Sequence, residues 1–155
     1  MRIRRLDCGR PEIVCAILQI QQAAYRVEAA IIGHQDLPPL RETAKDIGDS
    51  SEDFYGCYHG DDELLGIISL DRQPNEVFVC RLVVRPDSFR LGIGSALLRC
   101  AEARARTTRA PFIKVNAAIR NQPALALYRK LGFQSTREHT TPDGVDMIEL
   151  RKLIQ

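Results

Sequence analysis

Apolar residues recur at helical spacing in several stretches of the chain. Pro11 suits the first turn of a helix, where an N–H is not needed, and Ile13, Ile17 and Ile20 then share one face. Gly132 follows the last such stretch and can cap it in the left-handed conformation. The pattern predicts helices over Pro11 to about Tyr25, Leu40 to Ile47, the Gly92–Ser95 segment to about Arg106, and Asn121 to Leu131.

Alternating and continuous apolar runs, separated by turn-forming residues, predict strands. The expected strands are Arg2–Leu6, Asp53–Tyr58, Glu63–Leu70, Glu76–Val84, Phe112–Val115, Phe133–His139 and Val145–Leu150. The run Glu76–Val84 is the most apolar, which favours a central position in the sheet, and Pro86 ends it because proline cannot donate to a ladder. Asp143 and Gly144 mark the turn of a final hairpin.

The order of these elements indicates an α/β (α+β) protein with one domain, residues 1–155. A length of 155 residues suits a single domain that buries its own core without disulfides or metal. The hydrophobic fraction of 45% and the charged fraction of 27% are typical of a folded soluble chain. No repeat or linker divides the sequence.

Charge and cysteine content exclude several classes of protein. A net charge of +2 gives no support for nucleic acid or a membrane surface as a partner. The five cysteines are odd in number and show no C-x-x-C spacing, which argues against a disulfide framework and a metal site. The basic segment Met1–Asp7 lacks the apolar core of a signal peptide, and no run is long enough to span a membrane. We therefore expect a cytoplasmic protein without a metal.

The segment from Leu82 to Leu98 carries the clearest chemistry. A buried strand ends there, and Gly92 and Gly94 open a helix, so backbone N–H groups and the helix dipole meet at a point that suits a phosphate. A plain tight turn is the alternative. A P-loop would need Gly-Lys-Ser/Thr, and a dinucleotide fingerprint would need glycine at Leu97, so both of those sites fit poorly.

Two motifs together resemble the GNAT acetyltransferase superfamily. Leu82–Pro86 followed by Gly92–Leu98 is similar to its acetyl-CoA signature, and Asn121–Phe133 matches its pattern N-x-x-A-x-x-x-Y-x-x-x-G-F. The resemblance implies a mixed, mostly antiparallel sheet of about seven strands flanked by about four helices. It also implies transfer of an acetyl group from acetyl-CoA to a primary amine by direct attack in a ternary complex.

The resemblance also implies which residues hold acetyl-CoA. Asn121 would hold the pantetheine arm, although Asn is also a favoured N-cap. The family usually has Gln or Arg where this chain has Phe89, so the side-chain contact from this position to the cofactor is in question. Either Arg90 replaces it, or Arg90 is a solvated surface residue. The expected acetyl-CoA contacts are Leu82, Val83, Val84, Phe89, Arg90, Leu91, Gly92, Ile93, Gly94, Ser95, Asn121, Ala124 and Tyr128.

The sequence indicates the catalytic residues less completely than the acetyl-CoA contacts. The resemblance implies that Tyr128 donates a proton to the leaving thiolate, and the alternative is a packing role on the apolar stripe of its helix. It also implies that the Val84 region stabilises the oxyanion. The family's strand glutamate is replaced by Phe78, and Glu76 has the same parity, so Glu76 is the candidate base, with a solvated strand end as its alternative. Further candidates for the base are Asp53, Tyr55, His59 and Glu28, and a fixed base is not required.

The acceptor amine is not named by the sequence. We expect the segment Tyr25–Thr43, with Tyr25, Glu28 and Pro38, to form one wall of the substrate pocket. A small-molecule or peptide amine is the expected partner, and a homodimer through a sheet edge is possible. A non-catalytic acyl-CoA-binding sensor on the same fold, and a toxin that acetylates charged tRNA, are the alternatives.

Overall fold

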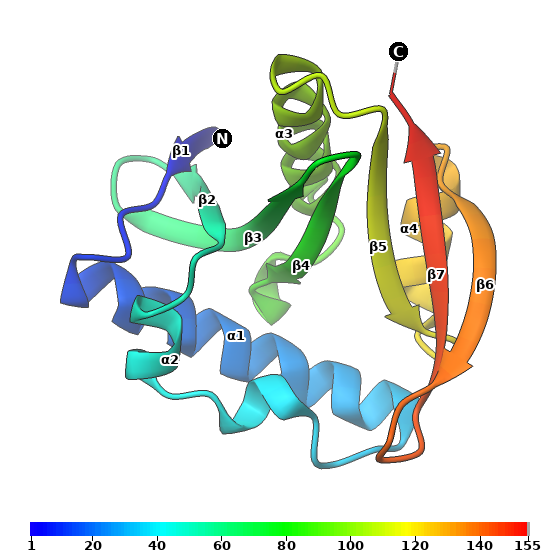
Figure 1. The fold of residues 1–155 in the computed structure, drawn as a ribbon. Helices are drawn as coiled ribbons and strands as arrows, with labels where there is room; N and C mark the ends of the chain where they lie inside the picture. The colour runs from blue at the N-terminus through cyan, green and yellow to red at the C-terminus, as the bar shows by residue number, and fades with distance from the viewer. Residues whose placement is uncertain (155) are drawn as a thin grey trace.

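Seven strands form one sheet in the order β1-β2-β3-β4-β5-β7-β6 in the computed structural model, which describes residues 1–154 (Figure 1). Every neighbouring pair is antiparallel except β4 and β5, which are parallel. The strands are β1 (Arg2–Arg5), β2 (Asp53–His59), β3 (Glu63–Gln73), β4 (Glu76–Val84), β5 (Phe112–Ala118), β6 (Gln134–Thr140) and β7 (Asp146–Leu153). The predicted mixed, mostly antiparallel sheet is confirmed.

The parallel pair β4–β5 separates partway along its length. Its last paired residues are Val79 and Val115, whereas β4 continues to Val84 and β5 continues to Ala118. The register of β4 against β3 also shifts between Val79 and Arg81, so Cys80 forms a β-bulge. A bulge bends its strand and increases the local twist. The two strands therefore diverge beyond the bulge, as Figure 1 shows.

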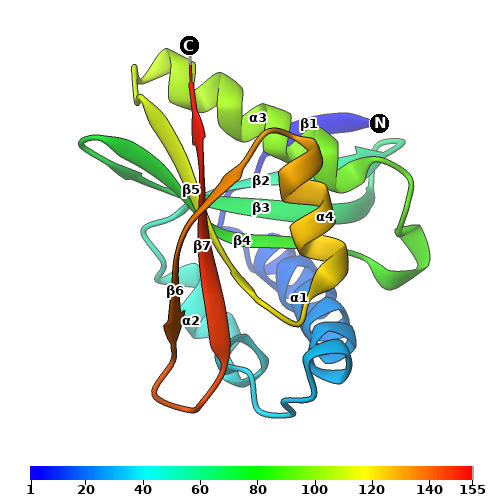
Figure 2. The same ribbon diagram turned by 90° about the vertical axis from the view of Figure 1, so that its right-hand side faces the viewer.

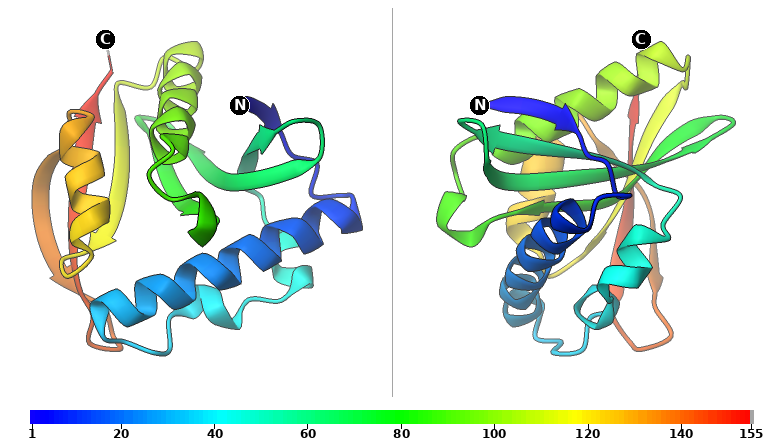
Figure 3. Two further views of the ribbon diagram at one scale, coloured as in Figure 1. Left: turned by 180° about the vertical axis from the view of Figure 1, so that it is seen from behind. Right: turned by 90° about the vertical axis from the view of Figure 1, so that its left-hand side faces the viewer.

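Helices cover both faces of the sheet. In Figure 1, α3 lies above β2–β4 and α1 lies below them, while α4 lies behind β5 and β7 (Figures 2 and 3). The helices are α1 (Pro11–Ile32), η1 (Pro38–Arg41, 3₁₀), α2 (Ala44–Gly48), η2 (Pro86–Ser88, 3₁₀), α3 (Ile93–Thr107) and α4 (Gln122–Lys130).

Two layers of apolar side chains result, one on each face. Ile17 and Ile20 of α1 pack with Phe54 and Ile67 below the sheet, and Leu97 of α3 packs with the layer above it. Gly66 of β3 allows α3 to come close, because a Cβ at this residue would lie 2.9 Å from a methyl carbon of Ile93. The helix that begins the glycine segment is thereby held against the centre of the sheet.

Strands β3, β5 and β7 each end three residues later than the sequence predicts, and two helical stretches differ more. Helix α1 continues past Tyr25 to Ile32, because Ala29 and Ile32 extend the buried face, and it ends at Gly33, which has a φ of 71°. The stretch Leu40–Ile47 is divided between η1 and α2, because Thr43 and Asp46 form a capping box that opens a new helix. Most of Tyr25–Thr43, the segment expected to form a wall of the substrate pocket, is therefore helical.

Within residues 1–154, no helix is both long enough and apolar enough to cross a membrane.

Candidate functional site

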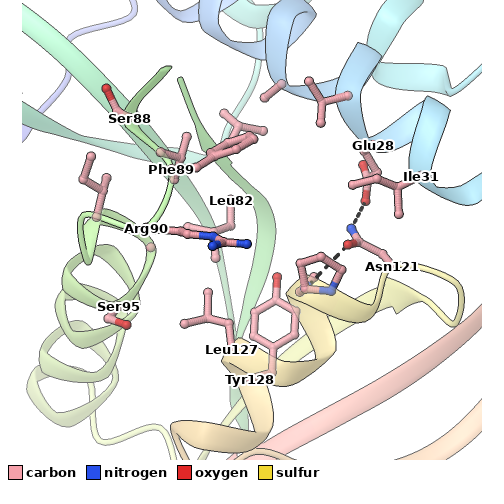
Figure 4. Close-up of a pocket in the computed structure, with 18 of the residues that line it drawn as sticks. Glu28, Ile31, Leu82, Ser88, Phe89, Arg90, Ser95, Asn121, Leu127 and Tyr128 are labelled. Carbon is pink, nitrogen blue, oxygen red and sulfur yellow. Dashed lines mark hydrogen bonds between the residues drawn. The ribbon is translucent and has the colours of Figure 1, made fainter. Parts of the chain in front are cut away.

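A cleft of about 630 Å³ opens beside β4, on the α3 and α4 side of the divergence from β5 (Figure 4). Its walls come from α1, the end of β4, the segment from η2 into α3, and α4. It is lined by Ala24, Tyr25, Val27, Glu28, Ile31, Leu82, Val83, Val84, Ser88, Phe89, Arg90, Gly92, Ile93, Gly94, Ser95, Asn121, Pro123, Ala124, Leu127, Tyr128 and Lys130.

One end of the cleft is the first turn of α3. Its first intrahelical hydrogen bond is donated by Ala96 N to Gly92 O, at 3.0 Å, so the preceding N–H groups have no acceptor within the helix. Gly92 has a φ of 79°, and a Cβ built on it would meet no atom within 4 Å. The glycine therefore supplies the left-handed turn and leaves the approach to these N–H groups open. Such a terminus suits a phosphate group.

Two cations line the same cleft as this helix terminus. Arg90 and Lys130 both line the cleft, and neither side chain has an ion-pair partner among residues 1–154. Arg90 also has a positive φ of 67°, and its guanidinium points into the cleft in Figure 4. The residues present thus fit the phosphates of a CoA thioester. Arg90 is exposed, so its guanidinium is solvated and also accessible to such a ligand.

Tyr128 of α4 directs its hydroxyl into the same cleft (Figure 4). Its ring is buried, with 6% of the residue exposed, and packs against Phe133 with ring centroids 5.7 Å apart. Burial raises the pKa of the phenol well above its usual value, and the charge of Glu28 raises it further. Tyr128 therefore keeps its proton at neutral pH, and its ring has the packing role that the sequence offered as the alternative.

Asn121 joins two elements that are distant in sequence. Its Oδ1 accepts a hydrogen bond from Ala124 N at 3.3 Å, which caps α4, and its Nδ2 donates to Oε1 of Glu28 on α1 at 2.8 Å. Both polar atoms of the amide are engaged by the protein itself. The expected N-cap role is therefore present, and Glu28 is held at the cleft.

Glu28 and Tyr25 lie one turn apart on the face of α1 that meets the cleft. Burial raises the pKa of Glu28, and the hydrogen bond from Asn121 offsets part of that rise. Burial also raises the pKa of Tyr25, with a further contribution from the charge of Glu28. These two residues were expected at the substrate site from the sequence, and the structure places them together.

Glu76 does not reach the cleft. It lies at the start of β4, on the far side of the bulge, where Oε2 is 2.8 Å from Nζ of Lys114 and Oε1 accepts a hydrogen bond from Arg151 at 3.2 Å. Glu76 does share its parity with Phe78, because both residues precede the bulge at Cys80, but neither of them lines the cleft, whose β4 residues begin at Leu82. The carboxylate of Glu76 is instead a partner of two cations.

The other sequence candidates for a base are also elsewhere. Asp53 pairs with Arg5 and Arg72, both at 2.8 Å. Tyr55 is buried in the layer below α3, and His59 is exposed at the end of β2. Of the five acids and bases considered, only Glu28 lines the cleft.

Most of the expected cofactor and substrate residues come together. Leu91 and Pro38 do not line the cleft, because Leu91 turns outward with 59% of its surface exposed and Pro38 begins η1 beyond the end of α1. The sequence analysis missed the lining residues Ala24, Val27, Ile31, Ser88, Pro123, Leu127 and Lys130. The helical spacing of Tyr25, Glu28 and Ile32, followed by Gly33, was the signal for the α1 residues among them.

Arg81 ties the segment after α1 to β4. Its guanidinium donates to both carboxylate oxygens of Glu42, at 2.8 and 3.0 Å, to Oε1 of Glu52 at 3.0 Å, and to Oε1 of Gln21 at 2.8 Å. Arg81 is 9% exposed, and Gln21 is fully buried. This polar cluster fixes η1 and the start of α2 next to the β-bulge.

A seven-stranded mixed sheet whose parallel strands β4 and β5 diverge beside a cleft defines the class of this protein. The chain belongs to the acetyltransferase (GNAT) family, whose model matches residues 15–133. Among the described residues, no group of three or more His, Cys, Asp and Glu side chains could hold a metal ion.

Solved structures with the same fold include several acetyltransferases. The ribosomal-protein-S18-alanine N-acetyltransferase from Escherichia coli superposes with a TM-score of 0.77 at 20% identity, over 99% of this chain and 94% of that one. An aminoglycoside 6'-N-acetyltransferase in complex with coenzyme A has a TM-score of 0.77 at 16% identity, over 100% and 98% of the two chains. At these identities the likeness shows the fold.

A curated relative is closer in sequence. UPF0157 protein YqkA from Bacillus subtilis (strain 168) is 40% identical over 129 residues, which make up 83% of this chain and 37% of that protein. The chain thus spans little more than a third of the length of this relative.

Proposed function

We propose that the protein is an N-acetyltransferase that moves the acetyl group of acetyl-CoA to a primary amine by direct attack in a ternary complex. The observation that carries the proposal is the cleft itself. It brings together the free N–H groups at the start of α3, the cations Arg90 and Lys130, and the buried phenol of Tyr128. The anionic phosphates and the thioester of one ligand match these groups.

The end of β4 provides the surface between them. Leu82, Val83 and Val84 line the cleft and lie beyond the last residue pair with β5. Their edge is free to bond the amides of a pantetheine arm, as an extended peptide bonds to a sheet edge. A backbone N–H on this edge is also the candidate to stabilise the oxyanion that forms when an amine attacks the thioester.

Tyr128 supplies the proton for the leaving group. A free thiol titrates near pH 8.5 and a phenol near 10, so transfer to a fully formed thiolate is slightly uphill in water. In a cleft with apolar walls an unprotonated thiolate is costly, which favours the transfer. Burial of Tyr128 at 6% exposure is consistent with such a site.

The acceptor is proposed only by class, as a small-molecule or peptide amine. The named relatives of the fold act on a ribosomal-protein alanine and on aminoglycosides, so the fold itself does not choose between small and peptide amines. A site in the cytoplasm is part of the proposal, supported by the five cysteines, none of which is in a disulfide. We propose no nucleic acid or membrane partner.

A screen of amines with acetyl-CoA, followed by release of free thiol, tests the proposal. The expected result is thiol release that depends on the amine, with the acetylated amine identified by mass spectrometry. Tight binding of acetyl-CoA without turnover of any amine would instead support a non-catalytic acyl-CoA sensor.

A further inference from the structure

Glu28 is the one acidic side chain among the residues that line the cleft. It is half-buried on α1 and points into the cleft beside Asn121 (Figure 4). Only its Oε1 is engaged, by the 2.8 Å bond from Asn121 Nδ2, and Oε2 has no hydrogen-bond partner among residues 1–154. The structure thus holds a carboxylate in a fixed orientation with one oxygen free.

Glu28 has no ion-pair partner among residues 1–154, and the causes of its pKa shift include no Lys or Arg. The residues of α1 around it that line the cleft are Ala24, Tyr25, Val27 and Ile31, and the bond from Asn121 comes from a neutral amide. By contrast, each oxygen of Glu76 faces a Lys or Arg. A carboxylate without a counter-ion in a partly apolar wall attracts a substrate ammonium and accepts its proton more readily than a paired one.

We propose that Glu28 is a catalytic residue that binds the ammonium of the acceptor and takes its first proton, directly or through one water molecule. This inference rests on the proposed N-acetyltransferase function and assigns the base that the reaction needs. It replaces Glu76, the candidate from the sequence.

The protons balance as follows. The ammonium gives one proton to the Glu28 carboxylate, and the neutral amine adds to the thioester carbonyl. When the C–S bond breaks, the thiolate takes the proton of Tyr128, and the second proton of the nitrogen passes to the phenolate that remains. The amide, free CoA thiol and protonated Glu28 result, and Glu28 then releases its proton to solvent.

The ionisation of Glu28 sets the expected pH dependence. The titratable groups coupled to it are Tyr25 on its own helix and Tyr128 on α4, and both stay protonated because burial raises each pKa. Burial raises the pKa of Glu28 above its usual 4.5. Activity should therefore fall as the pH decreases through this raised pKa, because the protonated carboxyl can no longer accept the proton.

The test compares Glu28→Gln with two further variants, using an amine that the wild-type protein acetylates. Gln keeps the size of the side chain and an oxygen for Asn121, but it cannot accept the proton. Glu28→Asp keeps a carboxylate, and Glu12→Gln makes the same change at an exposed residue of α1 that does not line the cleft.

For Glu28→Gln we expect kcat/KM for the amine to fall by about 10²- to 10⁴-fold, the usual contribution of a general base. The acidic limb of its pH profile should disappear, while the ionisation of the amine itself affects all variants alike. Acetyl-CoA affinity by calorimetry and the Tm should stay close to wild type. Glu28→Asp should keep the acidic limb at reduced rate, and Glu12→Gln should behave as the wild type does.

Two results overturn the assignment of Glu28 and leave the proposed function intact. One is unchanged kcat/KM in Glu28→Gln. The other is a loss that Glu28→Asp shares in full and that leaves the acidic limb in place, which marks a structural role for the bond to Asn121. A wild-type protein that acetylates no amine refutes the proposed function, and the role of Glu28 falls with it.

Discussion

Val79 and Val115 are the last paired residues between the parallel strands β4 and β5. One residue later, Cys80 forms the bulge that turns β4 away, and the cleft begins along the freed edge at Leu82. Glu76 and Phe78 both precede this bulge and do not line the cleft, so the bulge marks where the cleft begins along β4. Four predictions follow from the geometry around this point and at the edge of the sheet.

Replacing Tyr128 with Phe tests the proton donor. The change keeps the ring and its packing against Phe133 but removes the only proton that the side chain can give. We expect kcat to fall by about ten- to a thousandfold, the range of typical general-acid contributions, with acetyl-CoA affinity little changed. Steady-state kinetics with a confirmed amine measures the effect. An unchanged kcat at neutral pH, with chemistry rate-limiting, would make Tyr128 a packing residue only.

Replacing Gly92 or Gly94 with Val tests the phosphate end of the cleft. At Gly92 the new side chain would occupy open space beside the first turn of α3, and at Gly94 its Cβ would lie 3.1 Å from Leu127. Both changes should obstruct the approach of the phosphates, so we expect acetyl-CoA affinity in calorimetry to be lost or strongly reduced.

Gly60→Val is the matched control for Gly92→Val. Gly60 also has a positive φ, 64° against 79°, and also meets no atom within 4 Å, but it lies in the turn between β2 and β3. It should carry a similar backbone strain and bind acetyl-CoA normally. Unchanged affinity in a folded Gly94→Val protein would count decisively against this binding site.

Arg81→Met tests the cluster that holds the segment after α1 against β4. The change leaves Glu42 and Glu52 without their cation in a largely buried site, and we expect a loss of about 3–5 kcal/mol in the free energy of unfolding. Urea denaturation measures it. Arg41→Met, which removes the exposed pair with Asp36 in the same segment, should cost less than about 1 kcal/mol. Equal effects of the two changes would show that the buried cluster is not stabilising.

A homodimer through β6 is the fourth prediction. This strand lies at the edge of the sheet, and six of its seven residues are exposed, so its outer backbone groups are available to a second copy. Light scattering at micromolar concentration should give twice the mass of a single chain, which is 17.4 kDa. The substitution Arg137→Pro should then convert the dimer to monomer, because proline cannot donate a backbone hydrogen bond to the strand of the second copy. Light scattering that shows only monomer for the wild-type protein would refute the predicted dimer.

Much of the fold was predictable because its signals are local. The apolar periods of α1, α3 and α4 each place one face in the core, and Gly92 and Asn121 mark helix starts through backbone conformation and capping. The two motifs that carry the family resemblance lie within such local signals. For the same reason most of the residues from Leu82 to Ser95 and from Asn121 to Tyr128 that line the cleft could be named in advance.

The sequence by itself determined the elements, their order and the two motif segments that line the cleft, Leu82–Ser95 and Asn121–Tyr128. It could do so because short-range spacing decides which side chains share a face. Only the tertiary structure decided which acid belongs to the site. The cleft begins on β4 beyond the bulge at Cys80, which leaves Glu76 outside it, and the crossing of α1 over the sheet brings Glu28 to Asn121, 93 residues later in the chain. Where a strand leaves its partner, and whether two distant helices touch, both depend on how the elements pack on the sheet.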